Sequence, residues 1–424
     1  MTDNSPTAAA AHRPSLDAAA HVRRRYAAER RFKAIGLGAI FLALGFLAIL
    51  LWTIVSNGLS AFMQTYIRVD VRFDAESVAG EDYQGAIKSA LYARFPAVES
   101  RGERRELAAL LSSGADTALR RMLTADPSLV GTTKPVWLVA SDDVDMAIKG
   151  HISRQPGASG NRLTDRQLGW LGELEAAGTV EKRFNTILLS SGDSREPELA
   201  GLWGAVVGSV FSLVITLIVS FPLGVATAVY LEEFAPKNRW TALIEVNINN
   251  LAAVPSVVFG LLGLAIFLNF LGMPRSAPLV GGLVLALICL PTIIIAGRAA
   301  LKAVPPSIRE AALGLGASRL QVVNDHVLPL AMPGIMTGTI LGMAHALGET
   351  APLLMIGMVA FIVDIPASPL DPSAVLPVQV YLWADSPERA FVERTSAAIM
   401  ALLLFLGAMN LAAILLRKKF ERRW

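Results

Sequence analysis

Cysteine and charged residues are both scarce in this sequence of 424 residues. The only cysteine, Cys289, lies inside an apolar run. It cannot form a disulfide within the chain, and we interpret it as a small core residue rather than a metal ligand or a nucleophile. Charged residues make up 17% of the chain and hydrophobic residues 53%. Soluble domains carry more charge than this, so the balance predicts an integral membrane protein.

Motifs for nucleotide chemistry are absent as well. The sequence has no GxxxxGK[ST] loop, the element that holds the phosphates of a bound nucleotide. Residues 56–198 contain no metal-ligand, nucleophile or phosphate-loop pattern. We therefore expect a protein that is not an enzyme, has no catalytic residue, and binds no metal, cofactor or nucleic acid.

The first long apolar run lies at residues 34–55 and is long enough to span a membrane. Residues 1–33 are polar and alanine-rich and end in a basic cluster, which predicts a disordered cytoplasmic tail. The run begins too late for a cleavable signal peptide. Because basic residues precede the span, the N-terminus is expected to stay inside.

Residues 56–198 have an ordinary soluble composition and contain no further span. Local patterns predict helices at 83–95, 103–123 and 165–176 and a strand at 136–141. We expect a small α+β or α/β domain, outside the cytoplasm by the orientation of the first span. Its acidic run Asp142, Asp143 and Asp145 predicts a solvated loop, with a cation site as the alternative.

Long apolar runs in residues 199–424 predict a membrane domain. Five further spans are predicted at residues 202–231, 247–271, 278–296, 334–363 and 396–416. Counted from an inside N-terminus, the short basic segments all fall in the cytoplasm, as the positive-inside rule requires. Six spans result, and both termini and the loop at 301–329 are expected to be cytoplasmic.

A polar interruption at residues 305–334 separates two of these apolar segments. Ser307 and Glu310 have the spacing of a capping box, so a short helix is predicted to start there. Gly314 and Gly316 should end it after about two turns, because glycine costs about 1 kcal/mol inside a helix. The expected result is a helical elbow at the membrane surface. On local physics alone, Glu310 could equally be only a cap.

The same stretch resembles the EAA loop that permease subunits of bacterial ABC importers insert into their ATPase. The resemblance rests on the three residues from Glu310 to Ala312 and on Gly316, Leu328 and Pro329 at matching spacing. His326 departs from the pattern, because the family usually has an aliphatic residue there. The resemblance implies that an ATPase contacts Arg309, Glu310, Ala311, Ala312, Gly316, Leu328 and Pro329.

A pair of ionisable residues lies inside the predicted fifth span. His345 and Glu349 are four residues apart, which puts them on one side of a helix. Gly334, Gly338 and Gly342 form a row that leads to His345 and would let a partner helix approach closely. Ionisable groups at this depth are costly and usually line a polar pathway. The alternative is that the two residues only pair with each other.

Residues 345–354, HALGETAPLL, resemble the R-A-x-G-E-T-A-P-L-L signature of the A-type permease subunit of phosphate-specific (Pst) importers. Residues 229–233 (VYLEE) and 250–263 support the match, which covers 200–416 well. The resemblance implies a mainly α fold, namely the six-helix type I (MetI-like) permease. The inserted region 56–198 resembles the insertion found in one bacterial branch of the family.

For this family we expect a multi-pass inner-membrane subunit that imports inorganic phosphate by alternating access. Implied partners are a separate ATPase carrying ATP-Mg, a second permease, an extracytoplasmic phosphate-binding protein and membrane lipid. His345 and Thr350 would donate hydrogen bonds to phosphate, and Glu349 would accept its proton.

His345 stands where most relatives have arginine, a permanent cation. Arg298 is a possible substitute, although its position at the inner end of a span favours a membrane anchor. Three other functions remain open at this stage. They are a permease for another oxyanion such as phosphonate, a stand-alone secondary transporter or channel, and a sensor. Only residues 417–424 follow the last span, which disfavours a sensor with a kinase or cyclase module.

Overall fold

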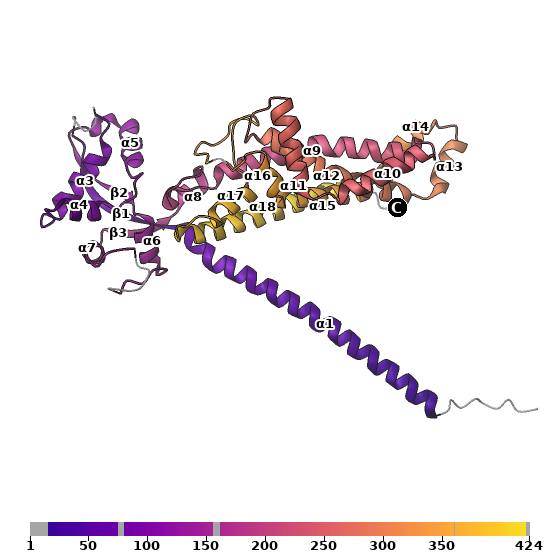
Figure 1. The fold of residues 1–424 in the computed structure, drawn as a ribbon, viewed down its shortest axis with the longest axis horizontal. Helices are drawn as coiled ribbons and strands as arrows, with labels where there is room; N and C mark the ends of the chain where they lie inside the picture. The colour runs from indigo at the N-terminus through magenta and orange to yellow at the C-terminus, as the bar shows by residue number, and fades with distance from the viewer. Residues whose placement is uncertain (1–15, 75–79, 156–161, 360, 421–424) are drawn as a thin grey trace, which may run out of the picture. The chain divides into compact units, whose positions relative to one another are not determined.

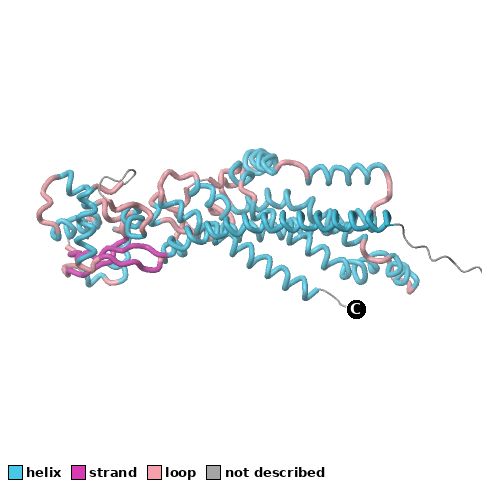
Figure 2. The backbone as a smooth tube through the Cα atoms, turned by 90° about the horizontal axis from the view of Figure 1, so that it is seen from below, coloured by secondary structure: helices cyan, strands magenta, loops and turns pink. Residues whose placement is uncertain are grey.

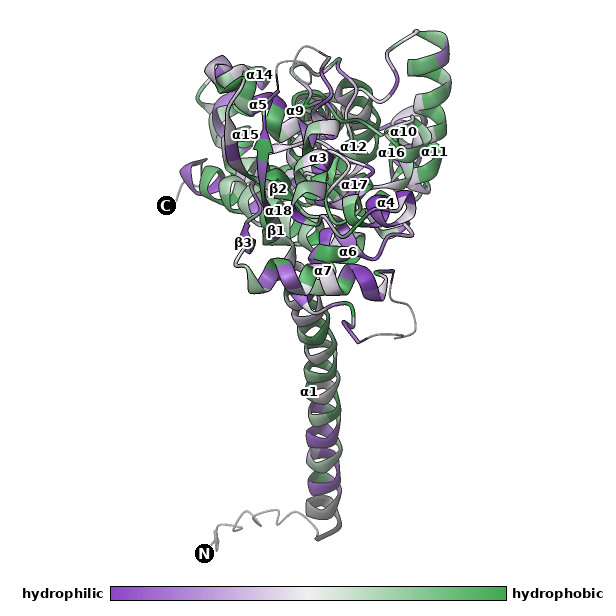
Figure 3. Ribbon diagram, turned by 90° about the vertical axis from the view of Figure 1, so that its left-hand side faces the viewer, coloured by the Kyte–Doolittle hydropathy of each residue, from purple (hydrophilic) through white to green (hydrophobic). Residues whose placement is uncertain are grey.

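The computed structural model describes residues 16–74, 80–155, 162–359 and 361–420 (Figure 1). Residues 1–56 and 57–424 form separate compact units. The first unit is dominated by one long helix, α1 (Leu16–Gly58). Its hydrophilic stretch and its apolar stretch follow one another along the helix in Figure 3. Residues 16–33 are therefore helical, and our prediction of a disordered tail is wrong for them; residues 1–15 lie outside the described residues.

The second unit begins with the inserted domain, which has a three-stranded antiparallel sheet in the order β2-β1-β3. The central strand β1 (Met63–Arg72) pairs with β2 (Thr133–Val139) and β3 (Val180–Phe184). The helices are α3 (Tyr83–Arg94), α4 (Arg101–Ala108), α5 (Asp116–Ala125), α6 (Asp142–Lys149), α7 (Asp165–Ala176) and α8 (Thr186–Ser190). Short 3-10 turns lie at Leu59–Phe62 (η1), Pro127–Leu129 (η2) and Pro197–Leu199 (η3). Antiparallel strands with helices against one face make this an α+β domain.

The core of this domain forms because β1 alternates between buried and exposed residues. Ile67, Val69 and Val71 are buried, whereas Arg68 and Asp70 point outward, as expected for a strand with one covered face. The buried residues of β1 pack with those of α3, α4, α5 and α7 in one cluster. We predicted helices in these regions from the sequence but not β1 or β3.

Two predictions for the inserted domain are wrong. The stretch 103–123 is not one helix, because residues 109–115 separate α4 from α5. The acidic run at 142–145 is not a solvated loop: it forms the first turn of α6, where acidic groups favour the positive end of the helix. Asp145 is buried there.

The helices of the membrane domain follow. They are α9 (Trp203–Val229), α10 (Arg239–Ala252), α11 (Ser256–Gly263), α12 (Pro278–Lys302), α13 (Pro306–Gly314), α14 (Arg319–Gln321), α15 (Leu328–Gly348), α16 (Ala351–Met355), α17 (Leu376–Ala384) and α18 (Ala390–Phe420). Wider π turns adjoin three of them at Tyr230–Phe234 (η4), Leu264–Phe270 (η5) and Val322–Val327 (η6). In the described residues, five helices are long and apolar enough to cross a membrane, or six if one bent pair counts as a span.

The bent pair is the predicted third span. Residues 239–252 and 256–270 meet at an angle of 100°. Pro255 lies at this bend and cannot donate a helical hydrogen bond. The predicted fifth span is also shorter than expected. Helix α15 ends at Gly348 rather than continuing to residue 363, and the short α16 follows after a break at Glu349 and Thr350.

Helix α12 lies at the centre of the membrane domain and packs against both α9 and α15. The glycine row on α15 makes this possible, as predicted. A side chain at Gly334 would come within 2.7 Å of the Ala300 Cβ, and one at Gly338 would collide with Ala296. Close approach of two helices through small residues is a common way to associate within a membrane.

Within residues 57–424, the sheet and the segment containing α13 and α14 lie at opposite ends of this helix bundle (Figure 2). The two non-membrane elements are thus separated by the length of the spans.

Candidate functional site

The elbow at residues 305–329 forms as predicted, but its first helix starts differently. Helix α13 has Pro305 at its N-cap and Pro306 at its first position, and no side chain caps it. Proline suits the first helical position because its missing N–H would have no helical partner there. The predicted capping box of Ser307 and Glu310 is therefore wrong.

The elbow is instead shaped by the end of α13 and the start of α14. Gly316 has a φ of +89°, and the N–H groups of Gly316 and Ala317 donate to the carbonyls of Leu313 and Ala312 at 2.9 and 3.1 Å. This is a Schellman motif, which needs a left-handed residue where glycine is favoured. A true capping box follows directly, formed by Ser318 and Gln321.

Arg309 holds the elbow to the membrane helices. Its Nη2 lies 2.6 Å from the Glu233 Oε1, and its guanidinium also donates to the carbonyls of Leu301 and Val304 at 2.9 and 2.8 Å. Arg309 is 22% exposed and Glu233 11%. A forked guanidinium that satisfies a carboxylate and two carbonyls fixes geometry better than a lysine would.

Three leucines of the elbow are exposed. Leu315 is 91% exposed, and Leu313 and Leu320 are exposed as well. Glu310 is also exposed, whereas Ala312 is buried in a cluster with residues of α9, α12 and α15. Together Leu313, Leu315 and Leu320 form the outer leucine face. We did not predict these leucines from the sequence, although their position around the glycines was a usable signal.

His345, Glu349 and Thr350 lie together where α15 ends. The His345 Nε2 is 3.1 Å from the Glu349 Oε1. Glu349 is not helical, because its backbone is extended at φ −77° and ψ 121°, and Thr350 precedes the first turn of α16. Non-helical backbone at membrane depth is tolerated where it is buried in protein or lines a polar cavity. His345 is 65% exposed in this chain and Glu349 15%, so the pair lies at the surface of the bundle.

Arg298 does not join this group. Its Nη2 lies 2.7 Å from the Glu245 Oε1, and its Nε is 3.5 Å from the Glu232 Oε2. Ala300 faces Gly334 and Ala296 faces Gly338 on α15. Arg298 lies between these two alanines in α12, so it is level with that part of α15 and not with His345. Lys302 also approaches Glu232, at 3.6 Å, and completes a charged cluster at that end of the bundle.

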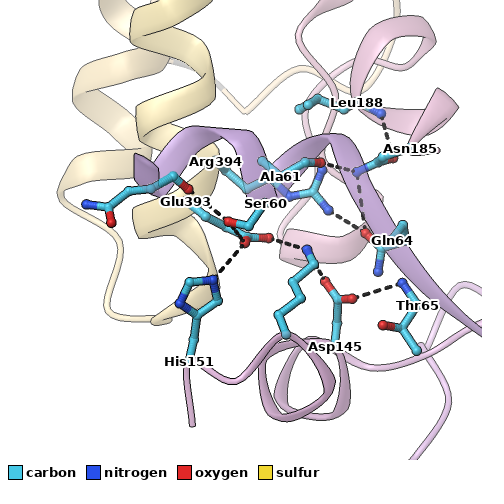
Figure 4. Close-up of polar contacts among 12 residues, drawn as sticks. Ser60, Ala61, Gln64, Thr65, Asp145, His151, Asn185, Leu188, Glu393 and Arg394 are labelled. Carbon is cyan, nitrogen blue, oxygen red and sulfur yellow. Dashed lines mark hydrogen bonds and ion pairs between the residues drawn. The ribbon is translucent and has the colours of Figure 1, made fainter. Parts of the chain in front are cut away.

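A second polar group, which the sequence analysis missed, joins the inserted domain to α18. Lys149 on α6 lies 2.6 Å from the Asp145 Oδ2 and 2.7 Å from the Glu393 Oε1, and the side chains of Lys149 and Glu393 are only 4% and 3% exposed. The Thr65 N–H donates to Asp145 at 2.9 Å and the Ser60 hydroxyl to Glu393 at 2.7 Å. Figure 4 shows Ser60, Thr65, Asp145 and Glu393 lying close together where these hydrogen bonds form.

The next residue of α18 extends the group. The Arg394 Nη2 donates to the Gln64 Oε1 at 2.6 Å, and Arg394 is 1% exposed. We call Gln64, Asp145, Lys149, Glu393 and Arg394 the junction network. The network contains two cations and two carboxylates, so its net charge is zero. Buried charges need such pairing, because an unpaired charge is costly to remove from water. The sequence signal for this network was the pair of adjacent charges Glu393 and Arg394, which lies just before the predicted span at 396–416.

Two segments of the chain match models of known protein families. Residues 220–424 match the model described as "binding-protein-dependent transport system inner membrane component". Residues 19–157 match a "domain of unknown function", DUF3333. The first match lies within the membrane helices, and the second covers α1 and much of the inserted domain.

Individual relatives align with about half of the chain. The phosphate transport system permease protein PstA 1 of Mycobacterium tuberculosis is 33% identical over 223 residues, which cover 53% of this chain and 72% of the relative. The PstA of Mycobacterium leprae is 34% identical over 226 residues, with coverage of 53% and 72%. A solved inward-facing methionine ABC transporter aligns with 52% of this chain and 98% of its own, at 17% identity and a TM-score of 0.42.

Proposed function

This chain belongs to the family of phosphate transport system permease proteins, and from this premise we propose that it is a membrane-spanning permease subunit of an ATP-driven importer of inorganic phosphate. It forms part of the translocation pathway and hydrolyses no nucleotide itself. ATP-Mg is bound by a separate ATPase, and a second permease and an extracytoplasmic phosphate-binding protein complete the importer.

The observation that carries this proposal is the elbow between α12 and α15. Its inner face is packed on the bundle and tied by Arg309, while its outer leucine face is exposed. An exposed apolar face on an otherwise well-packed element is typical of a protein interface. A secondary transporter or channel would have no use for such a face, whereas an importer permease presents it to its ATPase.

Orientation follows from the same assignment. The elbow and both termini face the cytoplasm, and the inserted domain, at the other end of the bundle in residues 57–424, faces outward. When ATP closes the ATPase dimer, the elbow moves with it. Arg309 transmits the movement to η4 and α12, which opens the pathway outward; hydrolysis returns it.

The pathway assignment uses the break between α15 and α16. Hydrogenphosphate offers anionic oxygens and one proton, whereas sulfate offers no proton. His345 and the Thr350 hydroxyl supply donors, and Glu349 supplies the acceptor. The 3.1 Å contact of His345 and Glu349 is the resting state of this pair, which opens to admit the anion. Because histidine lacks the permanent charge and the forked donors of arginine, the partner permease contributes further positive charge.

The test of the ATPase interface is Leu315→Asp, measured by co-purification with the ATPase and by uptake of radiolabelled phosphate in cells. The variant should lose both, because a buried unpaired charge at an interface costs several kcal/mol, on the order of 2–5. Leu189→Asp, on an exposed position of α8, is the matched control and should retain both. ATPase capture equal to that of the control would refute the interface.

The test of the pathway is Glu349→Gln, which keeps the shape of the side chain but removes the acceptor charge. Phosphate uptake should fall while the assembled complex still purifies intact. Normal uptake by the intact complex would rule out the role of Glu349. Loss of assembly would show instead that Glu349 only joins two helices.

A further inference from the structure

The inserted domain contains a cleft of about 740 Å³ that the transport function does not use. Its lining residues come from α3, α4, the start of α6 and the turn η3, together with residues between these elements. Clefts of roughly 300–1,000 Å³ are the usual size for small-molecule sites. Because η3 leads directly into α9, the cleft joins the inserted domain to the first helix of the membrane domain in residues 57–424.

Part of the cleft lining is cationic. Lys88, Arg101, Arg104 and Arg105 line it. Arg104 is already committed, because its Nε donates to the Val98 carbonyl at 3.2 Å and its guanidinium lies over the Tyr92 ring. Lys88, Arg101 and Arg105 are exposed and have their charges available to a ligand.

The lining also carries carboxyl and hydroxyl groups. Glu198 is 2% exposed, and among the described residues its Oε2 has no hydrogen-bond partner. The hydroxyl of Ser141, another lining residue, is buried without a partner among the described residues as well. Buried polar atoms are almost always paired in folded proteins. Two such atoms in one cleft point to a ligand that hydrogen-bonds there.

Two carboxyl groups that line the cleft have raised pKa values. Burial is the main reason that the pKa of Glu198 rises to about 7 and that of Asp142 to about 6. Near neutral pH these carboxyl groups can therefore either donate or accept a proton in a hydrogen bond with a ligand. Glu198 and Asp142 thus provide a proton acceptor or donor in a cleft that three available cations also line.

We propose that this cleft is a second ligand site, which binds a phosphate group, either inorganic phosphate or a small phosphate monoester. Lys88, Arg101 and Arg105 hold the anionic oxygens, and Glu198 accepts the proton of the P–OH group, with the Ser141 hydroxyl beside it. A carboxylate in the cleft rejects sulfate, which has no proton to offer when Glu198 is ionised. The volume leaves room for an organic group on a monoester.

The inference rests on the proposed function only for the outward location of the domain. A ligand in the cleft touches α4, α6 and η3 at once. Helix α6 also carries Lys149, which binds Glu393 of α18. The cleft is therefore connected to α9 through η3 and to α18 through α6.

The experiment uses the full chain in phosphate-free nanodiscs with an environment-sensitive dye on Ser113→Cys. Ser113 is exposed at the rim of the cleft, and Cys289 is buried. Inorganic phosphate, glycerol 3-phosphate and sulfate are titrated at constant ionic strength at pH 6 and pH 8. A saturable response to inorganic phosphate alone identifies the free anion as the ligand, and a tighter response to glycerol 3-phosphate identifies a monoester.

Variants assign the response to the cleft. The double variant Lys88→Glu, Arg105→Glu should weaken binding by at least about tenfold, because it removes two charge-assisted hydrogen bonds and adds two negative charges beside the anion. Arg121→Glu, on the exposed side of α5 outside the cleft, should not change it. Glu198→Gln should abolish the preference for phosphate over sulfate at pH 8.

Three results would overturn the proposal. They are no response to either phosphate compound by the folded chain, equal affinity for sulfate at pH 8, and an unchanged affinity in the double variant. The membrane pathway is controlled by Glu349→Gln, which should leave the dye response intact even where uptake is lost. Failure of the cleft and failure of the transport function are thereby distinguished.

Discussion

Within residues 57–424, the bundle of membrane helices carries the inserted domain at one end and the elbow at the other. These two elements are attached to the bundle in different ways. The elbow is held by Arg309 and Glu233, which remain partly exposed. The inserted domain is held by the junction network, in which Lys149 and Glu393 are almost completely buried. Partly solvated pairs can separate and re-form, whereas breaking a buried pair leaves an uncompensated charge. The elbow is thus the less tightly held of the two attachments, and the junction network the more tightly held.

The largest effect should come from breaking the more tightly held attachment with Lys149→Met. Asp145 and Glu393 would then be buried without their cation, at a cost of about 3–5 kcal/mol in stability. Thermal unfolding and limited proteolysis of the full chain measure this loss. The matched control is Arg166→Met, which removes the solvent-accessible ion pairs of Arg166 with Glu103 and Glu106. It should cost less than about 1 kcal/mol.

A second variant tests whether charge imbalance is the cause. Adding Glu393→Gln to Lys149→Met removes one of the two stranded carboxylates and should recover part of the loss. Equal losses in Lys149→Met and Arg166→Met would contradict a buried, tightly held junction and erase the difference between the two attachments.

The next effect is expected at the less tightly held attachment, from Arg309→Ala. Removal of the guanidinium frees two carbonyls and leaves Glu233 without its cation, which should cost about 2–3 kcal/mol locally. Amide exchange of α13 should then accelerate by about two orders of magnitude, and phosphate uptake should fall while global unfolding changes little. Arg319→Ala, an exposed basic position on α14, should leave exchange and uptake unchanged. A loss of global stability as large as that of Lys149→Met would refute the distinction.

Sequence reasoning succeeded where periodicity or a contiguous motif carried the information. The membrane helices, α3, α7 and the elbow follow from apolar runs, amphipathic spacing and glycine positions. The glycine row correctly predicted that a helix packs closely against α15, although not which helix. Strand β1 was missed although its alternation is clear, because tertiary pairing with β2 and β3 is what makes it a strand.

The adjacent charges Glu393 and Arg394 were a sequence signal for the junction network, but their partners were not predictable. Gln64, Lys149 and Glu393 are far apart in the sequence, and they meet only after the inserted domain folds against α18. Nothing local marks Lys149 as buried. The same holds for Glu198, whose chemistry depends on its burial in the folded chain.

Glu198 also gives the third prediction, a pH effect at the boundary between the inserted domain and α9. Burial raises its pKa from an ordinary 4.5 to about 7 in the folded chain. Between these values the unfolded chain releases the proton while the folded chain keeps it, so stability is greatest below pH 4.5 and falls as pH rises to 7.

Glu198→Gln should remove this fall. Compared with the unmodified chain, it should gain about 2 kcal/mol between pH 5 and pH 8, measured by thermal unfolding in phosphate-free buffer. Glu173→Gln, an exposed position on α7, should keep the original pH profile. A Glu198→Gln profile parallel to the original would show that this carboxyl ionises as freely as one in water.

The smallest effect tests how the less tightly held attachment is shaped. Ser318→Ala removes the hydroxyl that accepts a hydrogen bond from the Gln321 N–H at the start of α14. The loss of this cap should destabilise that turn by about 1 kcal/mol. Ser307→Ala should have almost no effect, since α13 begins at Pro306 without a side-chain cap. Amide exchange at Gln321 and along α13 separates the two cases. A larger effect at Ser307 would mean that the elbow begins with the capping box that the sequence suggests, and that α13 is fixed by its own first turn rather than by Arg309.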